Sequence, residues 1–168
     1  MQTRQANIDD AASIAKVHID SWKTTYSGIV PDEFLQTLTY EPKKWREQIV
    51  NQPIHIAEDK DGYMVGFATG GKERTGKYAG YDGELYAIYL LEDYQRKGIG
   101  NMLFQKVVEQ LYKDGVNTMI VKVLADNPAK HFYEAMDGSL LQRTKLHVGG
   151  HELPTLVYGW KDISIFTQ

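Results

Sequence analysis

The sequence contains no cysteine among its 168 residues. A chain without cysteine forms no disulfide bond, has no thiolate nucleophile and offers no Cys-ligated zinc site. A reducing compartment suits such a chain, and we therefore expect a cytoplasmic protein. The five histidines show no spacing typical of metal ligands, so no metal is predicted.

Long apolar runs and blocks of like charge are also missing. No window approaches the ~20 apolar residues that a membrane-spanning helix requires, and the opening MQTRQANIDD lacks the apolar core of a secretion signal. Lys and Arg number 19 against 22 Asp and Glu, which gives a net charge of −3 without a basic tail. We therefore expect neither a membrane nor a nucleic acid as a partner.

Turn signals divide the chain into short alternating segments, which predict a single domain over residues 1–168 with about 70% of its unfolded surface buried. Strands are expected at 3–7, 53–59, 63–71, 84–90, 116–124, 139–148 and 152–160. Helices are expected at 8–26, 31–38, 41–50, from the turn near 98 to about 113, and at 127–136. This order favours an α/β (α+β) fold in which helices cover both faces of a mixed, mostly antiparallel sheet.

The segment Gln95-Arg96-Lys97-Gly98-Ile99-Gly100 joins an apolar strand to an amphipathic helix. The first N–H groups of a helix have no partner within the helix, and the helix dipole makes that end positive. Glycines let an anion approach these N–H groups, while Arg96 and Lys97 add positive charge. The turn therefore predicts a phosphate or pyrophosphate site, although a solvated turn with no ligand has the same local pattern.

Two other phosphate-binding motifs fit less well. The dinucleotide-binding fingerprint requires a third small residue where this chain has Leu103, and no acidic residue follows at the ribose position. The segment GKERTGKY, residues 71 to 78, has the spacing of a P-loop, but Tyr78 replaces the Ser or Thr that binds Mg²⁺. That segment also precedes a strand instead of opening a helix, so we interpret the match as accidental.

Two longer stretches closely resemble the central motifs of the GCN5-related N-acetyltransferases, the GNAT superfamily. ELYAIYLLEDYQRKGIGNMLFQKVVEQL matches the strand, the Gln/Arg-x-x-Gly-x-Gly/Ala turn and the helix of the family. LADNPAKHFYEAMDGSL matches the family's Asn and Phe-Tyr-Glu helix, followed by a glycine. The resemblance covers residues 84 to 140, and a weaker one includes Trp22, Tyr26, Gly28 and Pro31. It implies a GNAT-type sheet of about seven strands with a splayed parallel pair at the cofactor site.

The resemblance also implies the cofactor and its contacts. Backbone N–H groups of Arg96, Lys97, Gly98, Ile99, Gly100 and Asn101 would hold the pyrophosphate of acetyl-CoA. The pantetheine arm would lie between the two splayed strands, against backbone atoms of Ile88, Tyr89 and Leu90, with Asn127 on the far side.

Acetyl transfer to an amine requires a neutral amine, stabilisation of the developing oxyanion and a proton for the departing thiolate. By resemblance, Tyr133 is the general acid next to the coenzyme A sulfur, and an aromatic packing role is its alternative. Glu84 matches the glutamate that takes the amine proton directly or through a water, although it could instead pair with a nearby base. The oxyanion would meet a backbone N–H near Leu90.

The acceptor amine is expected near the first helix, where His18, Trp22 and Tyr26 recur every four residues and share a face. We predict that Trp22, Tyr26 and Glu84 contact it, although an aromatic stripe is also typical of a core. Resemblance to polyamine-acetylating relatives makes a polyamine or another small amine the first choice, and an amino acid, an aminoglycoside-like amine, and a protein N-terminus or lysine remain open. A non-catalytic acyl-CoA-binding module is the alternative class. Members of the family are often dimers, so a homodimer is one expected form.

Overall fold

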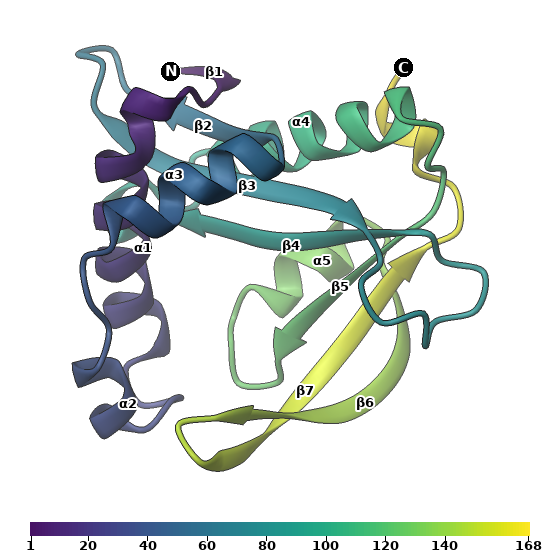
Figure 1. The fold of residues 1–168 in the computed structure, drawn as a ribbon. Helices are drawn as coiled ribbons and strands as arrows, with labels where there is room; N and C mark the ends of the chain where they lie inside the picture. The colour runs from purple at the N-terminus through teal and green to yellow at the C-terminus, as the bar shows by residue number, and fades with distance from the viewer.

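The computed structural model describes residues 1–168 (Figure 1). Its strands are β1 Gln2–Gln5, β2 Ile54–Glu58, β3 Met64–Lys72, β4 Gly83–Leu90, β5 Met119–Leu124, β6 Ser139–Val148 and β7 His151–Trp160. Its helices are α1 Ala11–Tyr26, α2 Asp32–Gln36, α3 Pro42–Asn51, α4 Ile99–Lys113 and α5 Lys130–Ala135, with short 3-10 turns at Ile8–Asp10, Glu92–Tyr94 and Ile163–Phe166. None of the helices combines the length and apolar character that crossing a bilayer requires.

The seven strands form one sheet in the order β1-β2-β3-β4-β5-β7-β6. Every neighbouring pair is antiparallel except β4 and β5, which are parallel. The predicted mixed sheet with one parallel pair is therefore confirmed. The fifth strand begins at Met119, three residues later than expected, because the N–H of Val116 closes the end of α4 by donating to the carbonyl of Leu111.

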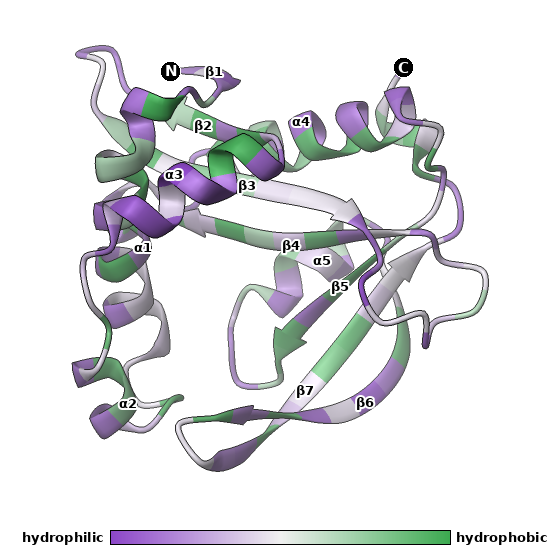
Figure 2. Ribbon diagram, viewed as in Figure 1, coloured by the Kyte–Doolittle hydropathy of each residue, from purple (hydrophilic) through white to green (hydrophobic).

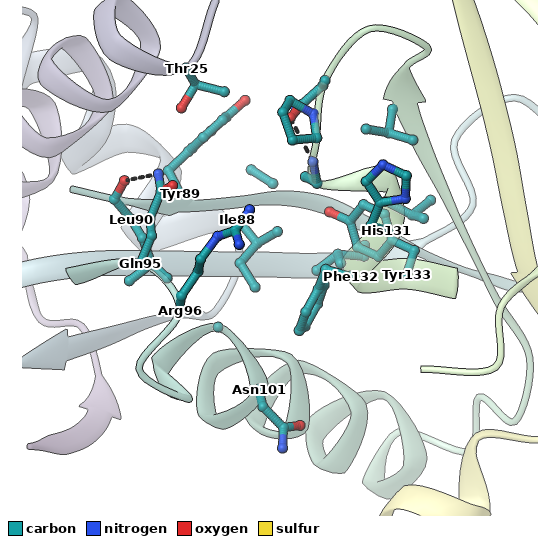
Figure 3. Close-up of a pocket in the computed structure, with 18 of the residues that line it drawn as sticks. Thr25, Ile88, Tyr89, Leu90, Gln95, Arg96, Asn101, His131, Phe132 and Tyr133 are labelled. Atoms are coloured by element: carbon teal, nitrogen blue, oxygen red, sulfur yellow. Dashed lines mark hydrogen bonds between the residues drawn. The ribbon is translucent and has the colours of Figure 1, made fainter. Parts of the chain in front are cut away.

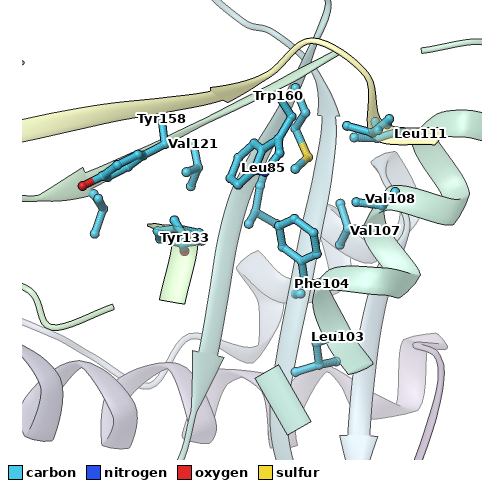
Figure 4. Packing of buried hydrophobic residues seen from close by; sticks show 14 of the residues in the cluster. Leu85, Leu103, Phe104, Val107, Val108, Leu111, Val121, Tyr133, Tyr158 and Trp160 are labelled. Carbon is cyan, nitrogen blue, oxygen red and sulfur yellow. The ribbon is translucent and has the colours of Figure 1, made fainter. Parts of the chain in front are cut away.

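Helices cover both faces of the sheet, as expected. On one face α4 packs its buried side chains, among them Phe104 and Val107, against Leu85 of β4 and Val121 of β5 (Figure 4). Figure 2 shows hydrophobic and hydrophilic residues alternating along α4, the pattern of a helix with one face on a core. On the other face α1 and α3 bury a second cluster, which includes Phe67 of β3.

A third, smaller cluster connects α1 and α2 with the long hairpin of β6 and β7. Tyr26, Val30, Leu35 and Leu124 form its buried part. At the hairpin tip the backbone of Gly149 lies so close to α2 that an added Cβ would be 2.7 Å from Cβ of Phe34. The end of α1 and the tip of the hairpin thus close one side of the molecule next to the gap between β4 and β5.

Candidate active site

The two parallel strands separate after a short contact. β4 and β5 pair only over Gly83–Leu85 and Met119–Val121. Opposite β3 the register shifts so that Tyr86 faces no residue of β3, and such a bulge bends a strand. The remainder of β4, to Leu90, consequently has no partner on the β5 side. A cavity of about 680 Å³ opens in this gap.

The free stretch of β4 is the wall for which an extended ligand arm was predicted. Ile88, Tyr89 and Leu90 all line the cavity. The side-chain amide of Gln95 donates to the carbonyl of Leu90 over 3.3 Å, which holds the following turn against the end of the strand (Figure 3). The backbone of β4 is therefore available to an added extended chain in the manner of a further strand.

At the end of this wall, residues 96 to 101 form what we call the anion cradle. Their six consecutive backbone N–H groups donate no hydrogen bond within the chain. Arg96, with φ 59°, and Gly98, with φ 81°, have left-handed conformations, and alternating conformations of this kind turn successive N–H groups toward one concave side. The dipole of the 15-residue helix α4 adds positive potential there.

Gly100 leaves room at the anion cradle that the chain itself does not fill. A Cβ at this position would lie 3.6 Å from Cδ1 of Leu90 and 3.8 Å from Cε2 of Phe132, both ordinary contacts. Packing within the chain therefore does not require a glycine here. The missing side chain instead opens the N–H groups to an approaching ligand, which fits a pyrophosphate.

Side chains of the cradle have different positions. Arg96 lines the cavity. Lys97 does not line it, and its ammonium lies 5.5 Å from the ring centroid of Tyr94. Ile99 is buried in the core and anchors the start of α4. The side chain of Asn101 points away from the other labelled residues in Figure 3, so its backbone N–H, and not its amide group, fits the predicted contact with an anion.

Asn127 and Tyr133 line the opposite wall, which comes from the segment after β5. The side-chain oxygen of Asn127 accepts from the N–H of Ala129 over 2.9 Å and fixes the entry into α5. Tyr133 is buried against Tyr158 and Trp160. Burial raises the pKa of the Tyr133 phenol well above its ordinary value, so the phenol is protonated at neutral pH and can donate a proton or a hydrogen bond.

Glu84 is fully buried and does not line the cavity. Its carboxylate accepts from the guanidinium of Arg74 over 2.8 Å and, more weakly, from the N–H of Arg74 over 3.3 Å. The same guanidinium lies 4.2 Å from the ring centroid of Tyr86. The structure thus places Glu84 in an ion pair next to the cavity, and its role in proton transfer remains a prediction.

Of the two aromatic residues predicted at the acceptor site, only Tyr26 lines the cavity. Its hydroxyl accepts from the side-chain amide of Asn127 over 3.4 Å. Trp22 packs between Tyr26 and Phe34, with ring centroids 4.4 and 6.1 Å away, and its indole N–H is buried without a partner. The structure therefore places Trp22 in the third cluster beneath the cavity wall, and contact with an acceptor remains a prediction.

Several cavity residues were not expected from the sequence. They include Thr24, Thr25, Tyr86, Lys122, His131 and Phe132. A signal was present for Lys122, because it is the one charged residue in the apolar strand MIVKVL. Thr24 and Thr25 carried no comparable signal, since their exposure depends on how the end of α1 faces the distant strands.

The segment 71–78, which has the spacing of a P-loop, contains its own hydrogen-bond acceptor. The carboxylate of Glu73 accepts from the N–H and hydroxyl of Thr75 over 2.9 and 2.7 Å, and from the N–H of Gly76 over 2.6 Å. These donors are the ones that a phosphate would require, so the loop does not present a free anion site.

A splayed parallel strand pair, a glycine-containing anion cradle and a buried tyrosine on the opposite wall define the class of an acyl-CoA-dependent acetyltransferase. The sequence model of the Acetyltransferase (GNAT) family matches residues 17–138, and the chain belongs to this family. The chain is 40% identical over 163 residues, 96% of its own length and 93% of the relative's, to the uncharacterised N-acetyltransferase YuaI of Bacillus subtilis.

Two further proteins add detail. The spermidine N(1)-acetyltransferase of Thermoplasma acidophilum is 27% identical over 120 residues, covering 69% of this chain and 73% of that protein. The solved structure of the PaiA N-acetyltransferase of Thermoplasma acidophilum in complex with coenzyme A superposes with a TM-score of 0.69 at 22% identity, covering 92% of this chain and 96% of that one. Acetyl-CoA is the cofactor of this chain, and the free N–H groups of the cradle and the unpaired length of β4 fit it.

Proposed function

We propose that this N-acetyltransferase acetylates the primary amine of a small molecule by direct transfer, without a covalent acyl-enzyme. The observation that carries the proposal is the run of six unpaired N–H groups, because it opens into the same cavity as Tyr133. No cysteine is present to act as a covalent nucleophile, and a direct transfer requires none.

Tyr133 is the proposed general acid. When bound, acetyl-CoA supplies the acetyl group as a thioester. Because burial keeps the pKa of the Tyr133 phenol above the ~8.5 of an ordinary thiol, Tyr133 first donates a hydrogen bond to the departing sulfur. The C–S bond breaks as the C–N bond forms, the thiolate takes the phenol's proton as it leaves, and the phenol regains a proton from solvent. The apolar packing of Tyr158 and Trp160 around the phenol fixes its position before the reaction.

Glu84 is the proposed acceptor of the amine proton. An alkylamine with a pKa of ~10.4 is protonated at pH 7, which places its nucleophilic form about 4 kcal/mol higher. Glu84 does not line the cavity, so we propose that it receives the proton through a water. Arg74 positions the carboxylate through the ion pair and so acts as a positioning residue.

The acceptor is proposed to enter on the side of Tyr26, where the end of α1 meets the cavity. The name of the spermidine-acetylating relative supports a polyamine, the first choice from the sequence. A free amino acid or an aminoglycoside-like amine is the alternative small acceptor, and a protein N-terminus or lysine is the alternative macromolecular one. Trp22 then acts from beneath by supporting Tyr26.

Thiol release from acetyl-CoA tests the proposal directly. Polyamines, amino acids, aminoglycosides and short peptides are offered one at a time, and the mass of each product identifies the acetylated atom. Turnover on a small primary amine is the expected result. Calorimetric binding of coenzyme A with no turnover on any amine would instead support a non-catalytic acyl-CoA-binding module.

We also propose that the protein is cytoplasmic and a homodimer. The absence of cysteine supports the first statement. The second rests on the family resemblance, and the mass of the native particle in solution by light scattering tests it.

A further inference from the structure

Lys122 points to the acceptor side of the gap. In a strand, successive side chains alternate between the two faces, and Val121 and Val123 belong to the core beneath α4. Lys122 therefore lies on the other face. Glu84 of β4 is in register with Ile120 of β5, so Lys122 shares the face on which Glu84 and Tyr86 lie. This half-buried lysine lines the cavity where the two strands diverge.

The ammonium of Lys122 has no ion-pair partner. No carboxylate oxygen lies within 4 Å of it, and it lies 5.4 Å from the ring centroid of Tyr78. Two carboxylates of this face are already engaged. Glu84 pairs with Arg74, and Glu73 accepts three hydrogen bonds from its own loop. Lys122 thus presents its ammonium at the cavity wall without a contacting counter-ion, and the carboxylate of Glu73 attracts it only from beyond the 4 Å of an ion pair.

The cavity has few carboxylates that could pair with a polycation. Glu92 is the one carboxylate among its lining residues, and it belongs to the turn that leads into the anion cradle. The acceptor side, lined by Thr24, Thr25, Tyr26 and Tyr86, has no carboxylate of its own. A polyamine would meet Lys122 as a like charge, whereas an acceptor with an acidic group would find a partner.

We propose that Lys122 binds an anionic group on the acceptor, so that the acceptor is an amine that also carries a carboxylate, such as an amino acid. This inference rests on the proposed acetylation of a small amine and selects among its substrates. A charge-assisted hydrogen bond to a carboxylate contributes enough binding energy for a roughly ten- to hundredfold preference over the same amine without the carboxylate. Lys122 is then a specificity-determining residue, and the hydroxyl of Thr25, which lines the same cavity, is an additional donor.

Matched acceptor pairs isolate the carboxylate. Each α-amino acid in the panel is compared with its decarboxylated amine and with its amide, and spermidine is included. The ratio of kcat/KM between the members of a pair is measured for the unmodified enzyme and for Lys122→Gln, Lys122→Arg and Lys113→Gln. Lys113 is exposed at the end of α4 and is the matched control for loss of one positive charge.

The unmodified enzyme should prefer the amino acid. Lys122→Gln should raise the KM for the amino acid by ten- to a hundredfold, with a smaller effect on kcat. The kinetic constants for the decarboxylated amine should stay unchanged. Lys122→Arg should restore most of the preference, and Lys113→Gln should retain all of it. If Lys122 served only to stack on Tyr78, Lys122→Gln would lower kcat/KM equally for both members of a pair.

Two outcomes would overturn this inference and leave acetylation itself intact: turnover that is equal or faster on the decarboxylated amines, or a loss of coenzyme A affinity in Lys122→Gln with an unchanged acceptor ratio. Coenzyme A binding without turnover on any amine would instead overturn the proposed function, and this inference with it.

Discussion

The side-chain amide of Asn127 donates to the hydroxyl of Tyr26 over 3.4 Å and so connects two residues that are 101 positions apart. The same Asn127 accepts from the N–H of Ala129 at the start of α5. One amide group therefore joins the end of α1, where the acceptor is proposed to enter, to the helix that carries Tyr133. Because both groups are buried, neither hydrogen bond is readily replaced by water.

Asn127→Ala should lower the free energy of unfolding by about 1–2 kcal/mol and also lower kcat, because α5 loses its entry contact and Tyr133 loses its fixed position. Asn127→Asp is the matched control, since its carboxylate still accepts from the N–H of Ala129 but cannot donate to Tyr26 as the amide does. Chemical denaturation and steady-state kinetics on both variants measure the two effects. Equal loss of stability in the two variants would show that the contact with Ala129 is not the important one.

Gly100→Asp should weaken coenzyme A binding by at least roughly a hundredfold, because a carboxylate in the anion cradle opposes the pyrophosphate at close range. Gly100→Ala separates charge from size. Its Cβ would have only ordinary contacts within the chain, so the melting temperature should stay unchanged while binding weakens less. Calorimetric titration measures the affinity of both variants for coenzyme A. An unchanged affinity in Gly100→Asp would show that this turn does not bind the pyrophosphate.

Tyr133→Phe should reduce kcat by roughly a hundredfold or more, with a much smaller change in the Michaelis constant for acetyl-CoA. The reason is that the phenol is proposed to act on the departing sulfur and not in the ground state. Because Tyr133 packs with Tyr158 and Trp160, the ring should still fill its place in the variant. Kinetics indistinguishable from those of the unmodified enzyme would exclude Tyr133 as the acid.

His18 makes stability dependent on pH. Burial, followed by the nearby charge of Lys44, lowers the pKa of the His18 imidazole to about 4, whereas an unfolded histidine has a pKa of ~6.5. The folded state therefore disfavours protonation of His18. The neutral imidazole makes its full contribution to the free energy of unfolding above pH ~6.5, and this contribution is lost as the pH falls toward 4. Because solvent still reaches part of the imidazole, the free energy of unfolding should fall by roughly 1–2 kcal/mol from this group over that range.

Denaturant titrations at pH 7 and pH 4.5 on His18→Gln and on the exposed His131→Gln test this assignment. His18→Gln should show a shallower pH dependence than the unmodified protein, and His131→Gln should match it. Burial also lowers the pKa of His55, so some dependence should persist in His18→Gln. Identical slopes in all three proteins would show that His18 titrates normally in the fold.

Local features of the sequence predicted the backbone of the site. Contacts between distant segments determined the surroundings of its side chains, which the sequence did not show. The anion cradle was predictable because glycines and basic residues at a strand-to-helix turn act through their own backbone. The helical spacing of Trp22 and Tyr26 correctly placed them on one face, but it could not show that Phe34 and Tyr89 cover Trp22. The partner of Glu84 was equally hidden, because Arg74 reaches it from a preceding loop with no regular spacing.

Glu84→Gln provides the test of the proposed base. The variant should lose most of its kcat/KM at pH 7, where the acceptor amine is protonated, and should recover progressively as the pH rises toward the amine's own pKa of ~10.4. Arg74→Gln is the matched variant, because it breaks the same ion pair but keeps the carboxylate. It should lose stability and part of kcat/KM, because the carboxylate is no longer held in place, but it should not show the recovery at high pH that marks loss of the base. If both variants instead lose activity by the same factor at every pH, Glu84 and Arg74 serve only to hold the loop against β4, and the amine loses its proton to water or to another group.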